Sequence, residues 1–177
     1  MKLRILFSLC AAGLVTACSA AGPVGNVAVP QPTAPVELNS YLGRWYELAR
    51  YDNRFERGCE GVTADYSLRD DGMIRVVNTC HQGGVDGQAK AVEGRAKIVP
   101  ASGNAKLKVS FFGPFYGDYW VLDHAPDYSW SIVGEPSGAY LWILTREAKP
   151  AAAMREMLVK KVAALGYDVN LLRWTQH

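Results

Sequence analysis

The clearest pattern along the chain is an alternation of apolar and polar residues. In "VTADYSL" (62–68) every second residue is apolar, and "AVEGRAKI" (91–98) and "KLKVSFF" (106–112) repeat this pattern. A period of two is typical of half-buried strands in an antiparallel sheet. Turn signals rich in glycine, proline and aspartate separate the runs. We therefore expect eight strands between Trp45 and Arg146.

A helical period replaces the alternation near the end of the chain. The stretch "KPAAAMREMLVKKVAALGYD" (149–168) has Pro150 where the first helical residue is expected and Gly166 just beyond the last turn. Its apolar residues recur with a spacing of about 3.6, which predicts one amphipathic helix on the outside of the sheet. These residues are Met154, Leu158, Val162 and Leu165. The segment 169–174 is predicted to be a short strand or an extended tail.

A meander of eight strands would leave two unpaired edges, and closure into a barrel removes them. The predicted fold class is therefore all-β: an eight-stranded antiparallel up-and-down β-barrel with one C-terminal α-helix packed outside. A barrel of this size holds either a core of side chains or one small ligand. Small residues at expected inward positions (Ala64, Gly94 and Ala96) favour a cavity. A solid barrel is the alternative.

The first residues resemble an export signal. Lys2 and Arg4 precede the apolar run "ILFSLCAAGLV" (5–15), which is too short to span a bilayer. These two residues also account for the net charge of +2, since 17 basic residues then face 17 acidic residues. A neutral mature chain gives no electrostatic reason to expect nucleic-acid binding.

The signal ends in "VTAC" (15–18), which resembles the bacterial lipobox. The resemblance implies cleavage before Cys18, a diacylglyceryl thioether on its sulfur and acylation of the new N-terminus. Ser19 at the next position implies sorting to the bacterial outer membrane, with the protein on the periplasmic face. Several acyl chains hold a protein on a membrane far better than one. A plain signal peptide cleaved after Ala20 is the alternative.

These segments divide the chain into three parts: a lipoprotein signal peptide (1–17), a lipidated cysteine with a proline-rich tether (18–36) and a barrel domain (37–177). The stretch 19–36 contains four prolines and no charged residue, so it is not expected to build a helix or a core. Treated as a coil, it reaches about 20 to 25 Å. That length holds a domain just off a membrane surface.

Four cysteines occur in the whole chain. Cys10 is lost with the signal and Cys18 carries lipid, which leaves Cys59 and Cys80 in an oxidising compartment. One pair in an exported protein predicts a disulfide. Two free thiols are the alternative, and neither cysteine lies in a metal-binding pattern.

Three short motifs of the barrel resemble those of the lipocalin family. They are Gly43-x-Trp45 on the first strand, Asp127-Tyr128 before a later strand, and Arg146 after "YLWILT". Longer stretches such as "RFERGCEGVTADYSLRDDG" resemble the bacterial outer-membrane lipoproteins of that family. The resemblance implies that Trp45 closes one end of the barrel and that Arg146 lies across it. Pro126 stands where the family usually has threonine.

The resemblance also implies that the loop after the first strand partly covers the open end. Phe55 on that loop either contacts ligand or packs on the loop itself. The run "FFGPFYGDYWV" (111–121) is either part of the mouth, a membrane contact or ordinary core.

A barrel cavity lined by valine, alanine, phenylalanine, tyrosine and tryptophan side chains selects long apolar ligands by burial. The expected ligand is a fatty acid or a lysophospholipid, with its headgroup at the mouth. The later tryptophans are ambiguous, because both faces of their strands are apolar. The predicted ligand-binding residues are Tyr66, Val92, Ala96, Leu107, Val109, Phe111, Tyr116, Tyr119, Trp130 and Trp142.

No catalytic residues, metal ligands or cofactor are predicted. The chain has no Gly-x-Ser-x-Gly, His-Glu-x-x-His or P-loop motif, and its histidines (His81, His124 and His177) are scattered. The sequence therefore predicts a lipid-binding protein without enzyme activity, for storage, scavenging or transport, as a monomer or a homodimer. The alternatives are a lipocalin-type enzyme acting on bound lipid and a structural envelope lipoprotein without ligand.

Overall fold

The computed structural model describes residues 25–26 and 30–177. The predicted signal peptide and Cys18 lie outside the described residues. Within the described part, no helix has the length and apolar character needed to cross a membrane.

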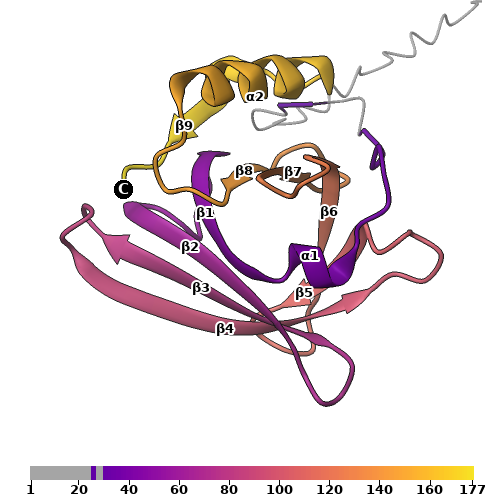
Figure 1. Ribbon diagram of the computed structural model, residues 1–177. Helices are drawn as coiled ribbons and strands as arrows, with labels where there is room; N and C mark the ends of the chain where they lie inside the picture. Colours follow the sequence, from indigo (N-terminus) through magenta and orange to yellow (C-terminus); the bar gives the residue numbers. More distant parts are fainter. Residues whose placement is uncertain (1–24, 27–29) are drawn as a thin grey trace, which may run out of the picture.

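The predicted barrel is confirmed (Figure 1). Strands β1 to β8 pair antiparallel in chain order, and β1 pairs with both β2 and β8, which closes the sheet on itself. The short strand β9 pairs with the C-terminal end of β1, at Ala49 to Tyr51. The strands are β1 (Gly43–Tyr51), β2 (Cys59–Leu68), β3 (Ile74–Gln82), β4 (Gln88–Ile98), β5 (Lys106–Ser110), β6 (Gly117–His124), β7 (Trp130–Gly134), β8 (Leu141–Thr145) and β9 (Leu172–Trp174).

The predicted outer helix is α2 (Ala152–Ala164), which lies across the outside of β1, β7 and β8 in Figure 1. Its residues Leu158 and Val162 face the barrel wall and are fully buried, as the periodicity predicted. Gly166 follows the helix with a φ of +89°, a backbone conformation that favours glycine. The predicted start was wrong by two residues, because Pro150 precedes the N-cap residue Ala151. The segment 169–174 forms a 3₁₀ turn, η1 (Val169–Leu171), and then β9.

Two apolar clusters lie on the two sides of the barrel wall. The inner cluster lies inside the barrel and includes Trp45, Tyr66 and Leu107. The outer cluster lies between the wall and α2, and includes Ile132 and Ile143. Because β1, β7 and β8 contribute to both clusters, both faces of these strands are apolar, unlike the alternating strands on the far side.

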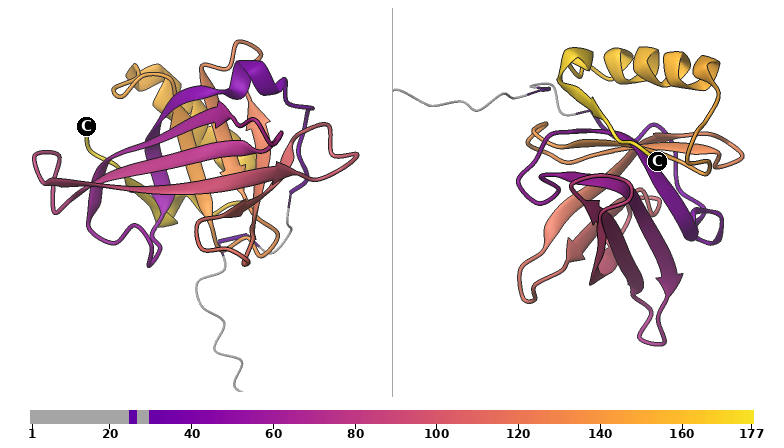
Figure 2. Two further views of the ribbon diagram at one scale, coloured as in Figure 1. Left: turned by 90° about the horizontal axis from the view of Figure 1, so that it is seen from below. Right: turned by 90° about the vertical axis from the view of Figure 1, so that its left-hand side faces the viewer.

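The two ends of the barrel differ (Figure 2). One end, here called the closed end, carries the short helix α1 (Leu38–Tyr41) and the loops 69–73, 99–105 and 125–129. The other, here called the open end, carries the loops 52–58, 83–87, 111–116 and 135–140. No periodic pattern predicted α1, because four residues are too few to show one.

Residues 30–36 lie along the barrel wall, although the sequence predicted a free tether up to residue 36. The amide of Thr33 donates to the carbonyl of Leu122, and that of Val36 donates to the carbonyl of Gly103. Val36 is only 2% exposed. The part of the predicted tether nearest the barrel is therefore bound to it.

Candidate ligand-binding site

The closed end is sealed by an indole under a guanidinium. Trp45 is fully buried, and its Nε1 donates to the carbonyl of Tyr41 at 2.8 Å. The guanidinium carbon of Arg146 lies 3.7 Å from the centroid of the indole ring system. Its nitrogens donate to the carbonyls of Arg44 at 2.6 Å and of Ser40 at 2.8 Å. Arg146 thus joins β8 to β1 and to α1, the position that the family resemblance implied.

Gly43 and the Asp127-Tyr128 pair have backbone roles at this end. Gly43 has a φ of +91°, a value that other residues rarely adopt. The Asp127 carboxylate accepts from the amide and the hydroxyl of Ser129, and these hydrogen bonds lower its pKa. The Tyr128 hydroxyl accepts from the amide of Glu37 at 2.7 Å. The turn forms with Pro126 in the place of threonine.

Tyrosine side chains occupy the part of the barrel interior nearer the closed end. The hydroxyl of Tyr119 lies 2.9 Å from the hydroxyls of both Tyr41 and Tyr66, and Tyr41 also reaches Ser131 at 3.2 Å. Burial raises the pKa of Tyr41 to about 12, and it raises the pKa of Tyr119 well above its ordinary value. These phenols stay neutral, so the lower interior is a packed and hydrogen-bonded floor.

Most of the predicted ligand-binding residues lie on the inner face. Strand register places Ala64, Asn78 and Val92 side by side on three neighbouring strands, and Val92 remains 40% exposed. Toward the closed end the inner face becomes fully buried. The predicted residues that belong to the inner cluster are Tyr66, Ala96, Leu107, Val109, Phe111, Tyr119 and Trp142.

Two predicted residues lie outside the barrel. Trp130 belongs to the outer cluster, and the ammonium of Lys161 from α2 lies 4.8 Å from its ring. The hydroxyl of Tyr116 accepts from Nε of Arg95, and Lys97 lies over its ring. Both basic residues are on the outer face of β4. The periodicity could not place Trp130, because both faces of β7 are apolar, and Tyr116 lies in a loop where strand parity does not apply.

Gly94 makes space for an aromatic ring and not for a ligand. A Cβ at this position would lie 2.6 Å from Cδ1 of Phe111 and 2.7 Å from the carbonyl oxygen of Ser110. The prediction that small inward residues leave a cavity therefore fails here, because Phe111 uses the space.

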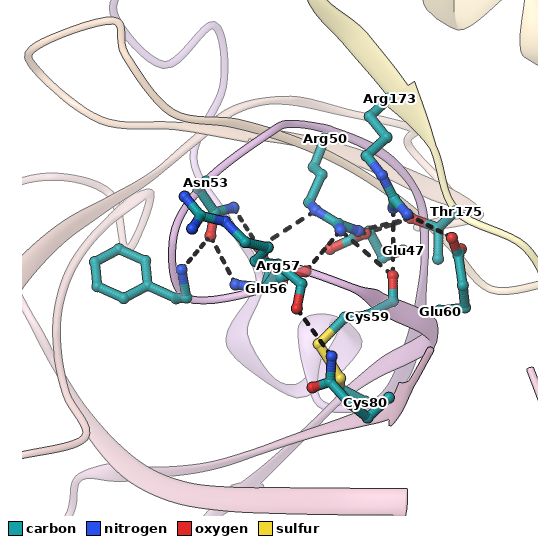
Figure 3. Close-up of a disulfide and its surroundings, with 12 residues drawn as sticks. Glu47, Arg50, Asn53, Glu56, Arg57, Cys59, Glu60, Cys80, Arg173 and Thr175 are labelled. Carbon is teal, nitrogen blue, oxygen red and sulfur yellow. Dashed lines mark hydrogen bonds and ion pairs between the residues drawn. A yellow bond between two sulfur atoms is a disulfide. The ribbon is translucent and has the colours of Figure 1, made fainter. Parts of the chain in front are cut away.

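A buried charged cluster near the open end was not predicted (Figure 3). Arg50 is fully buried, and its Nη1 donates to Glu47 at 2.5 Å and to Thr175 at 3.2 Å. Its Nη2 donates to the carbonyl of Glu56 at 2.9 Å. A bulge in β1 between Glu47 and Ala49 turns Glu47 and Arg50 to the same side. Simple alternation would have placed them on opposite faces, so the sequence pattern could not reveal the pair.

The protonation of this cluster follows from its burial. Desolvation raises the pKa of Glu47 to about 8, and the negative charge of Glu56 adds to the effect, against the opposing pull of Arg50. The raised pKa favours the protonated form of Glu47 near neutral pH, and the Glu56 carboxylate lies 3.9 Å from the Arg50 guanidinium.

Loop 52–58 is held at the open end from two sides. The Glu56 carboxylate accepts from Nε1 of Trp142 at 3.0 Å, which connects the loop to the inner face of β8. The predicted disulfide between Cys59 and Cys80 is confirmed, and it joins β2 to β3 beside the loop. Neither sulfur is available as a thiolate nucleophile. Phe55 stacks on Tyr140, with ring centroids 6.0 Å apart, and stays 65% exposed.

Two surface hollows lie away from the inner face. One runs beside α2 between Ala153 and Ala164, and the other lies at Leu68–Asp71 near Arg75. Neither is lined by the inner cluster. A ligand inside the barrel would therefore use the partly exposed inner face near the open end, here called the upper wall, which includes Val92. The described residues also contain no group of three histidine, cysteine or acidic side chains that could hold a metal ion.

Comparison with known proteins gives concordant matches. The family model described as "Lipocalin-like domain" matches residues 36–177. The outer membrane lipoprotein Blc of Citrobacter freundii is 41% identical over 174 residues, covering 98% of this chain and 96% of the relative. Blc of Vibrio cholerae is 38% identical over 175 residues, covering 98% and 99%.

More distant matches extend the comparison. Apolipoprotein D of Macaca fascicularis is 34% identical over 159 residues, covering 86% of this chain and 82% of the relative. Insecticyanin from the tobacco hornworm Manduca sexta shares the fold, with a TM-score of 0.66, 22% identity and 84% of each chain covered.

Proposed function

The chain belongs to the lipocalin family, which binds hydrophobic ligands in a barrel, and we propose that its ligand is a single-chain amphiphile, a fatty acid or a lysophospholipid. The acyl chain enters through the open end and lies against the upper inner wall. The headgroup stays between the open-end loops. The biological role is storage, scavenging or transport of lipid.

The observation that carries this proposal is the gradient of exposure along the inner face. Trp45 and Ala96 near the closed end are fully buried, whereas Val92, on the same face as Ala96, is 40% exposed. Exposed apolar surface on the inside of a wall gains free energy when a hydrocarbon chain covers it, by about 25 cal/mol per Å². The tyrosine floor limits how deep the chain reaches.

One polar atom on this wall favours a ligand with a hydroxyl group. The Oδ1 of Asn78 is buried and has no hydrogen-bond partner among the described residues. Its neighbours in register are Ala64 and Val92. The glycerol hydroxyl of a lysophospholipid could donate to this oxygen, whereas an ionised fatty acid has no donor. This difference supports a lysophospholipid over a fatty acid.

We place the protein at the bacterial outer membrane, anchored by lipid on Cys18. Support comes from the lipobox-like sequence 15–18. It also comes from relatives named outer membrane lipoproteins, which this chain matches over nearly their whole length. The anchored protein would meet single-chain lipids where membrane damage or turnover releases them.

Native mass spectrometry of the full chain purified from membranes tests the ligand. We expect a co-purifying mass of one single-chain lipid, which is removed by organic extraction and restored by adding lysophospholipid. A chain that neither carries nor takes up any single-chain lipid would refute the proposal.

A bulky substitution on the exposed part of the inner face tests where the ligand binds. Val92→Trp places an indole on the exposed part of the inner face, and we expect at least a tenfold loss of affinity for the acyl ligand. Glu93→Trp is the matched control, because Glu93 points outward and pairs with Arg75. Equal affinity in both variants would place the ligand elsewhere.

A further inference from the structure

Among the four phenylalanines in the described part of the chain, three are exposed, and all three lie on open-end loops. Phe55 on loop 52–58 is 65% exposed, and Phe112 and Phe115 on loop 111–116 are 77% and 79% exposed. Val85 on loop 83–87 is also exposed. An apolar ring of this size normally lies inside a folded protein or in an interface. At the opposite end of the barrel, Leu68 is the one large apolar side chain with comparable exposure among the described residues.

The charges beside these rings suit a phosphate-rich surface. Arg54 lies 5.1 Å from the centroid of Phe55, and Arg57 is exposed on the same loop. Glu56, the acidic residue between them, is turned inward to Trp142 and Arg50. The outward face of this segment therefore combines an aromatic ring with two guanidinium groups and one carboxylate, that of Asp52, and the excess of positive charge favours contact with lipid phosphates.

The described chain begins at this same end. The carbonyl of Gly25 accepts from the amide of Asp168 at 3.0 Å, and Nδ2 of Asn26 donates to the carbonyl of Leu165 at 2.8 Å. A Cβ on Gly138, in the open-end loop 135–140, would lie 1.8 Å from the carbonyl oxygen of Asn26. Figure 2 shows residues 25–26 next to the open-end loops in its left view.

We infer that the open-end loops dock on the phospholipid bilayer that holds the lipid anchor, with Phe112 and Phe115 in the interfacial layer and the barrel mouth facing the membrane. This inference rests on the anchor in the proposed function. Six residues lie between Cys18 and Gly25, so Gly25, beside the mouth, is held within about 25 Å of the anchored cysteine. The occupant is therefore the membrane itself, because Gly25 and Asn26, close in sequence to the lipidated Cys18, lie beside the loops that carry the exposed rings.

The arrangement gives a short path for the ligand. A lipid that leaves the periplasmic leaflet of the outer membrane enters a mouth already in contact with that leaflet, so its acyl chain crosses little water. The aromatic rings act as wedges among the headgroups, a position that suits aromatic side chains at membrane interfaces.

Site-specific photocrosslinking of the full lipidated chain in phospholipid vesicles tests the inference. The photoreactive residue p-benzoylphenylalanine replaces Phe112, Phe115 or, as the matched control, Leu68. We expect adducts of diacyl phospholipid at Phe112 and Phe115 in at least about tenfold higher yield than at Leu68, as burial of one aromatic side chain implies. Diacyl adducts that are absent at the two phenylalanines, or as frequent at Leu68, would overturn the inference.

The mass of the adduct separates the two proposals. Single-chain adducts alone would show that these rings touch a bound ligand and not the bilayer, which overturns docking and leaves the ligand proposal intact. Diacyl adducts in a chain that carries no single-chain lipid by native mass spectrometry would support docking and refute the ligand proposal. As a second readout, Phe112→Ser with Phe115→Ser should slow lipid uptake from vesicles, whereas Leu68→Ser should not.

Discussion

Arg146 makes several different contacts at the closed end of the barrel. It covers the Trp45 ring and donates to carbonyls of Ser40, Leu42 and Arg44, so one side chain connects three segments of the closed end. None of these contacts lies on the partly exposed upper wall. Its role is therefore to hold the end shut.

We expect Arg146→Ala to lower the free energy of unfolding by about 2 to 4 kcal/mol, because several hydrogen bonds from a charged group and a cation–π contact are lost together. Ligand affinity should change much less. Urea denaturation and lipid titration measure the two effects. Arg146→Lys keeps the charge without the fork of donors and should lose an intermediate amount. A denaturation midpoint equal to that of the wild type would contradict this role.

Glu47 predicts a dependence of stability on pH. Its pKa of about 8 in the folded chain lies above its ordinary value of 4.5, so between these pH values the folded state holds a proton that the unfolded state releases. This contribution to stability is complete below about pH 4.5 and is lost as pH rises through 8. Glu47→Gln mimics the protonated carboxyl and should flatten the curve over that window, by up to about 1.4 kcal/mol per pH unit. Unfolding curves at pH 5 to 9 measure it, and an unchanged slope in the variant would contradict the assignment.

Single residues show where the sequence was sufficient and where it was not. Trp45, Gly43 and Arg146 were placed correctly because short motifs fix them at the ends of strands. Glu47 and Arg50 were missed because a bulge breaks the alternation on which the prediction depended. Trp130 was placed on the inner face, although β7 is apolar on both faces and pattern alone cannot choose between them.

Among the larger elements, loop 52–58 is the one whose position depends on the disulfide. Cys59 begins β2 directly after the loop, and its bond to Cys80 spans a sequence separation of 21 residues. The partner strand β3 continues to the floor of the barrel, so the bond ties the mouth to the rigid wall. Glu56 and Trp142 make the second attachment.

Replacing both cysteines by alanine should cost roughly 3 kcal/mol of unfolding free energy in the chain-entropy model. Hydrogen exchange should also rise over residues 52–60, because one of the loop's two attachments is gone. The wild type treated with a reductant is the control and should reproduce the variant. Equal midpoints for the oxidised and reduced wild type would show that the bond does not stabilise the fold.

Elements were predictable where one face is clearly polar. The strands β2, β4 and β5 alternate cleanly and were identified with the correct inward residues, such as Ala96 and Val109. The wall-bound segment 30–36 was not predicted, because its proline-rich composition is that of a tether. Its hydrogen bonds to Leu122 and Gly103 depend on the folded barrel.

Across the whole molecule, three features point to the same end. The inner wall becomes exposed there, the exposed phenylalanines lie there, and Gly25 and Asn26, which are close in sequence to Cys18, contact the barrel there. The closed end has the opposite character, with a buried indole and a compact helix. The barrel is therefore polarised along its axis, with one end built for stability and one for exchange.

This polarity makes the lipid anchor separable from the fold. Cys18 lies outside the described residues, and the described barrel is held together by its own contacts, so Cys18→Ser should leave both the unfolding midpoint and the affinity for lysophospholipid in solution unchanged. The variant should move from the membrane fraction to the soluble fraction and take up lipid from vesicles more slowly, since its mouth is no longer held at the bilayer. Fractionation, intact mass and uptake kinetics measure these effects. Wild-type protein with an unmodified N-terminus at residue 21 would refute the anchor, whereas equal uptake rates for an acylated wild type and the variant would refute only the advantage of holding the mouth at the membrane.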